Sequence, residues 1–141
     1  MAYIEWLPSW DTGIAELDRQ HRELVAEIDR LFLALKEGSP EKVAERTLLH
    51  LSEYVEFHFK TEERCMLEAH YPGLPAHRAE HDALRNEVKA IVDAYLAGGG
   101  ALTVKLSEYL KNWLIHHLDT TDRIMAEHLR RTLASLPGIP D

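Results

Sequence analysis

Histidine and carboxylate side chains recur at helical spacing in this sequence, and this pattern is what could carry chemistry. His58 and Glu62 lie four residues apart, as do His77 and His81, so each pair falls on one face of a helix. His21, His117 and Asp122 are the other candidates, which gives five imidazoles and two carboxylates. Imidazole and carboxylate ligands at octahedral sites suit iron or manganese better than tetrahedral zinc. The residue types therefore predict a metal centre.

The number of these donors predicts two metal ions rather than one. Two octahedral ions need roughly twelve coordination positions between them. Five imidazoles, two bridging carboxylates and one bridging oxo or hydroxo group would fill about eleven of those positions. The remaining position would be open to a small molecule, provided that Glu62 and Asp122 both bridge.

Four helices are expected to position these residues. Glycine and proline are concentrated between long segments that contain few helix breakers, and Ser39 followed by Pro40 is typical of a helix start. The connections are short, so neighbouring helices should run antiparallel. The prediction is an all-α, antiparallel, up-down-up-down four-helix bundle in a single domain over residues 1–141. It comprises an N-terminal arm at 1–14 and helices near 15–37, 41–70, 75–97 and 101–133.

Each expected helix carries an apolar seam that is interrupted by the ionisable residues above. The first seam, for example, includes Leu17, His21 and Leu24. A buried carboxylate without a partner costs several kcal/mol or becomes protonated. Because all four apolar seams contain ionisable residues, a shared metal centre is the simplest partner for those residues.

One spacing does not fit a regular helix. His117 and Asp122 are five residues apart, which rotates them by about 140° on an ideal helix. Thr120 and Thr121 are β-branched and form helices weakly. We therefore expect a wide turn, a kink or an unwound hydrogen bond within 117–122.

The arrangement of these residues resembles the hemerythrin family over nearly the whole chain. The combination of seven ligand positions in order is specific, although each piece alone would be weak. The matching stretches are Asp18 to Leu24, His58 to Glu63, His77 to His81, and Trp113 to His117 continuing to Asp122.

The resemblance implies two iron ions per chain, joined by an oxo or hydroxo bridge, that bind O2 reversibly. His77, His81 and His117 would hold one iron, and His21 and His58 would hold the iron with the open position. Glu62 and Asp122 would bridge the two. The apolar residues that would line the O2 site are Leu24, Phe59, Trp113, Leu114 and Leu118.

Two other functions remain as alternatives. A di-iron oxidase, peroxidase or ferroxidase of the ferritin-like class would carry Glu-x-x-His motifs, and no histidine here has a glutamate three residues before it. A free-standing O2 or redox sensor would need a separate partner protein. The expected role is therefore oxygen storage, transport or delivery, with no catalysis.

Composition limits the partners. The formal net charge of −8 argues against nucleic acid and anionic membranes, which need a basic surface. The first ten residues do not look like a secretion signal, and the single cysteine suits a reducing compartment. We therefore expect a cytoplasmic monomer whose partners are O2 and, as a candidate recipient, an O2-consuming membrane enzyme. The remaining histidines are interpreted as surface or boundary residues. Glu63 and Glu80, beside expected ligands, are interpreted as solvated, although carboxylates next to ligands commonly orient them.

Overall fold

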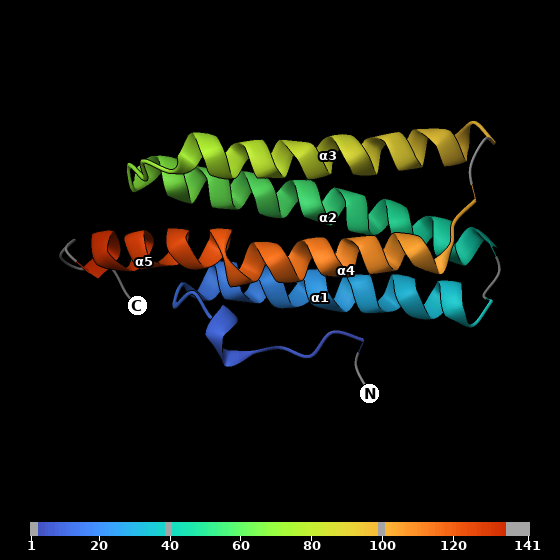
Figure 1. Cartoon of the computed structure of the whole chain (residues 1–141), viewed down its shortest axis with the longest axis horizontal. Coiled ribbons are helices and arrows are strands. Elements are labelled where there is room, and N and C mark those ends of the chain that lie inside the picture. The colour runs from blue at the N-terminus through green and yellow to red at the C-terminus, as the bar shows by residue number, and fades with distance from the viewer. Residues whose placement is uncertain (1–2, 39–40, 99–100, 135–141) are drawn as a thin grey trace.

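The helices form an antiparallel four-helix bundle whose fourth member is divided in two (Figure 1). A computed structural model describes residues 3–38, 41–98 and 101–134. The helices are α1 (Ala15–Lys36), α2 (Glu41–Glu68), α3 (Leu74–Leu96), α4 (Val104–Asp119) and α5 (Thr121–Ala134). The expected helix start at Ser39 and Pro40 lies outside the described residues, as do Gly99 and Gly100.

Two helix ends differ from the sequence prediction by more than one residue, and the backbone shows why. The second helix ends at Glu68 rather than at 70, where His70 takes a left-handed conformation with a φ of 53°. The fourth begins at Val104 rather than at 101, because Thr103 is still extended, with φ −130° and ψ 164°.

The expected irregularity between His117 and Asp122 is present as a break at Thr120. Thr120 has φ −118° and ψ −74°, and it separates α4 from α5. The two helices continue in the same direction on either side of the break (Figure 1). The prediction of an interrupted helix is thus confirmed, and the single helix expected over 101–133 is corrected.

The apolar core is divided into two clusters with polar residues between them. The larger cluster includes Leu24, Phe59 and Leu114, and the smaller one includes Leu17 and Met125. His21 lies between Leu17 and Leu24 along α1, so the buried ionisable residues occupy the layer between the two clusters.

An N-terminal arm packs against the bundle. It contains a short 3-10 helix, η1 (Pro8–Trp10), in which Trp10 is buried. The indole N–H of Trp10 donates to the carboxylate of Asp119, directly before the helix break. Tyr3 stacks on Phe32 of α1 with ring centroids 3.8 Å apart. Among the described residues, no helix has the length and apolar character needed to cross a membrane.

Candidate metal centre

All seven residues singled out by the sequence meet in the polar layer of the bundle. None of them is more than 2% exposed. They come from every helix: His21 from α1, His58 and Glu62 from α2, His77 and His81 from α3, His117 from α4 and Asp122 from α5.

Glu62 lies at the middle of this cluster, and its two oxygens face different histidines. Oε1 lies 2.7 Å from Nε2 of His77 and 3.2 Å from Nε2 of His81. Oε2 lies 3.0 Å from Nε2 of His21 and 3.1 Å from Nε2 of His58. One carboxylate therefore spans two groups of imidazoles.

Asp122 spans the same two groups from the opposite helix. Oδ1 lies 3.1 Å from Nε2 of both His77 and His117, and Oδ2 lies 3.2 Å from Nε2 of His21. Neither oxygen has a hydrogen-bond partner among the described residues. A buried carboxylate in this state calls for a cation.

The break at Thr120 is what turns Asp122 inward. It offsets the rotation of about 140° that a regular helix would place between His117 and Asp122, so both side chains face one centre. Two contacts hold this part of the chain: Trp10 donates to Asp119, and the Thr121 hydroxyl donates to Glu80, 2.7 and 2.8 Å from its two oxygens.

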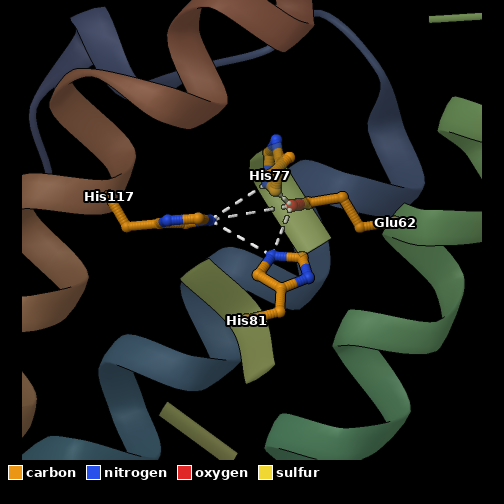
Figure 2. A group of neighbouring side chains, drawn as sticks. All are labelled: Glu62, His77, His81 and His117. Carbon is orange, nitrogen blue, oxygen red and sulfur yellow. Dashed lines mark hydrogen bonds and ion pairs between the residues drawn. The ribbon is translucent and has the colours of Figure 1, made fainter. Parts of the chain in front are cut away.

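The first group consists of His77, His81, His117 and Glu62 (Figure 2). Ligands about 2.1 Å from an ion and at right angles lie about 3.0 Å apart, and opposite ligands lie about 4.2 Å apart. Nε2 of His117 is 3.1 Å from that of His77 and 3.2 Å from that of His81. Glu62 Oε1 is 3.9 Å from His117 Nε2, near the separation of opposite ligands. These separations fit one octahedral ion.

The second group consists of His21, His58 and Glu62. It shares Glu62 with the first group, and Asp122 Oδ2 approaches it at His21. This group has fewer protein donors than the first, which leaves more of an ion's coordination positions for other ligands.

The outer nitrogens of three histidines are held by residues from neighbouring helices. Nδ1 of His58 donates to Gln20 Oε1 (2.9 Å), Nδ1 of His81 to Glu63 Oε2 (2.7 Å), and Nδ1 of His117 to Glu80 Oε1 (3.1 Å). A proton on Nδ1 leaves the Nε2 lone pair facing the centre. For Glu63 and Glu80, the alternative role of orienting a ligand is therefore the one the structure shows, and the interpretation as solvated residues was wrong.

Gln20, Glu63 and Glu80 share one signal in the sequence. Each adjoins a candidate ligand in the chain, but each holds a histidine on another helix. Adjacency could have marked them as candidates. The pairing itself depends on how the helices pack.

The buried carboxylates of the cluster favour positive charge on the groups around them. Burial alone would lower the pKa of His21, but Asp122 and Glu62 outweigh it and raise this pKa to about 10. The pKa of His77 rises to about 9 because the same carboxylates outweigh its burial. Burial lowers the pKa of His58. The two buried carboxylates thus attract positive charge, and a metal ion would displace the protons.

A small internal cavity lies beside the cluster. Its volume is about 20 Å³, enough for one water-sized molecule. Four of the five expected O2-pocket residues line it: Leu24, Phe59, Trp113 and Leu114. Leu118 is buried in the same core but is not among the lining residues.

Two aromatic residues connect this cavity to the candidate ligands. The ring of Phe59 stacks on His81 with centroids 3.8 Å apart, and Trp113 stacks on His117 at 4.5 Å. The rings therefore fix the orientation of two imidazoles and also form part of the cavity wall.

Comparison with known proteins agrees with this geometry. The hemerythrin HHE cation binding domain matches residues 12–129. The bacteriohemerythrin of Methylococcus capsulatus is 26% identical, covering 88% of this chain and 95% of that protein. The bacteriohemerythrin of Aquifex aeolicus is 30% identical, covering 80% and 87%. The crystal structure of a wild-type hemerythrin matches with a TM-score of 0.86 at 26% identity, covering 91% of this chain and 98% of that one. The chain belongs to the hemerythrin family.

Proposed function

We propose that this protein binds O2 reversibly at a non-heme di-iron centre, for oxygen storage, transport or delivery. The observation that carries the proposal is the division of the seven donors. Glu62 and Asp122 each direct one oxygen to the His77 side and the other to His21. Two ions bridged by two carboxylates need this arrangement.

Within this proposal, His77, His81 and His117 hold one iron, and His21 and His58 hold the other. Iron there would supply an open coordination position and the reversible electron transfer that O2 binding needs. The protein residues fix the imidazoles through Gln20, Glu63 and Glu80. They also keep bulk water from the layer, since every candidate ligand is buried.

The cavity supports binding over catalysis. Its described lining consists of aliphatic and aromatic side chains, with no carboxylate, histidine or lysine among them. Cleavage of O2 at such a site would need a nearby proton donor. An oxidase or peroxidase is therefore the less favoured alternative.

An optical spectrum tests the proposal directly. The purified protein is loaded with Fe(II), kept anaerobic and then exposed to air. A charge-transfer band should appear with O2 and fade under argon, with two irons per chain by metal analysis. Any one of three results would overturn the proposal: one metal ion per chain, zinc as the main metal, or steady consumption of O2.

The cellular setting stays a prediction. A cytoplasmic location, a monomeric state and an O2-consuming membrane enzyme as recipient follow from the sequence argument alone. Sedimentation measures the oligomeric state. A recipient enzyme would be identified if the iron-loaded protein raises the rate of that enzyme at low O2.

A further inference from the structure

The two groups of histidines differ in what holds their outer nitrogens. In the three-histidine group, His81 and His117 donate to the carboxylates of Glu63 and Glu80. In the two-histidine group, His58 donates to the neutral amide of Gln20. Nδ1 of His21, and Nδ1 of His77 in the first group, have no hydrogen-bond partner among the described residues.

We propose that the two metal positions are unequal in affinity: the position at His77, His81 and His117 fills first and retains its ion, while the position at His21 and His58 fills second and exchanges. The proposal rests on the two-metal site described above. It assigns Glu63, Glu80 and Gln20 as positioning residues that set this order.

The physical reason is the donor strength of the imidazoles. A carboxylate that accepts the outer N–H of a metal-binding histidine makes the inner nitrogen more basic, and removing such a partner weakens metal binding about 10–100-fold. Two histidines of one group have this support, and neither histidine of the other has it. The first group also offers three imidazoles rather than two.

The structure keeps the charged partners in place. Arg85 donates to Glu63 from Nη1 at 3.0 Å and from Nη2 at 3.3 Å. Thr121 donates to Glu80. The Glu63 side chain is 13% exposed, so solvent screens its charge only weakly, whereas Glu80 is 43% exposed. We therefore expect Glu63 to contribute at least as much as Glu80.

At the two-histidine position, a neutral residue stands between the histidine and the nearest carboxylate of this chain of contacts. The amide nitrogen of Gln20 donates to Glu16 Oε1 at 2.7 Å, which turns its oxygen toward His58. Gln20 is fully buried, whereas Glu16 lies near the surface. The negative charge of this pair is therefore one residue removed from the imidazole.

An anaerobic titration of the metal-free protein with Co(II), followed by calorimetry and visible absorption, tests the order. The wild type should show two steps of different affinity. Glu63→Gln and Glu80→Gln should each weaken the first step about 10–100-fold, since the charge is lost while an acceptor oxygen remains. His58→Ala should abolish the second step only. Glu56→Gln is the matched control, because Glu56 contacts Arg85 but no candidate ligand.

A charge-conserving swap tests the other position. The double variant Glu16→Gln with Gln20→Glu keeps the total charge and the hydrogen-bonding pair but places the carboxylate against His58. It should strengthen the second step. Unfolding of each metal-free variant, monitored in parallel, shows whether the fold is intact.

The outcomes separate the two proposals. Binding of only one ion to the wild type would overturn the di-iron function. Two ions of equal affinity would overturn the inequality while leaving the di-iron site intact. Gln variants that bind as the wild type does would overturn the role assigned to Glu63 and Glu80. If Glu80→Ala weakens the first step but Glu80→Gln does not, position alone matters and the charge argument is wrong.

Discussion

At the scale of single residues, neighbouring histidines on α4 have opposite surroundings. His117 is 2% exposed and faces the carboxylates, whereas His116 is exposed. We expect His117→Ala to lose metal or retain a single ion, because it removes one of three imidazoles at its position. His116→Ala should keep two irons per chain and normal O2 binding. Metal analysis of both variants checks this, and equal damage from His116→Ala would contradict the assignment of α4.

The identity of the seven candidate ligands was predictable from residue types and spacing, but their orientation was not. His58 and Glu62 share a helical face at any packing angle. By contrast, the contact of Glu80 with His117 joins residues 37 apart in sequence. Such a contact depends on the relative rotation of α3 and α4, which local spacing does not fix. For the same reason, Leu118 was expected at the cavity but does not line it.

At the scale of helices, the break at Thr120 allows residues on both sides of it to face the interior of the bundle. Asp122 has to face His117, and Met125 and Leu129 have to stay in the smaller apolar cluster. The odd spacing of His117 and Asp122 and the weak helix propensity of the threonines made the break predictable. Its location at one residue was not, because it also depends on Trp10 and Glu80.

Deletion of Thr120 tests the role of the break. It restores the regular spacing of His117 and Asp122 but rotates Met125 and Leu129, which are 0% and 2% exposed, away from the core. We expect a loss of at least about 2 kcal/mol in the free energy of unfolding and a loss of bound metal.

Thr120→Ala is the matched control for this deletion. It keeps the chain length and removes the γ-methyl group and the hydroxyl that donates to the carbonyl of His116. It should therefore bind two irons. A deletion variant that is as stable and as metal-rich as Thr120→Ala would show that the break is dispensable.

A pH-dependent contact joins α1 to α2 away from the candidate metal centre. His50 Nδ1 lies 2.7 Å from Oε1 of Glu27, whose side chain is 2% exposed, and this carboxylate raises the pKa of His50. A pKa that is higher in the folded state stabilises the fold fully below the unfolded value of about 6.5, and the effect is lost as pH rises through the folded value.

Thermal unfolding of His50→Gln should reveal this contact. The midpoint temperature should fall relative to the wild type at pH 5.5, and the difference should shrink toward pH 9. The substitution His116→Gln, at another exposed histidine, controls for general surface effects. A difference for His50→Gln that grows with pH would reverse the sign of the argument.

At the scale of the whole molecule, a surface groove lies next to the cavity beside the metal layer. A surface groove of about 410 Å³ runs between α2 and α3. Val55 lines both this groove and the internal cavity, and it is 7% exposed. Val88 lines the groove alone, and Leu110 lines the cavity alone. The Val55 side chain therefore separates the groove from the cavity.

We expect Val55→Ala to speed both the binding and the release of O2, because it removes two methyl groups from this barrier at a cost of about 1.5 kcal/mol of stability. Val88→Ala makes the same change at 6% exposure but opens no connection, so its rates should stay near those of the wild type. Leu110→Ala enlarges the cavity from within and should alter affinity more than entry. Stopped-flow measurement of O2 binding and release on the iron-loaded variants compares all three. Equal acceleration by Val55→Ala and Val88→Ala would mean that general loosening of the α2–α3 contact, rather than the Val55 side chain, controls access.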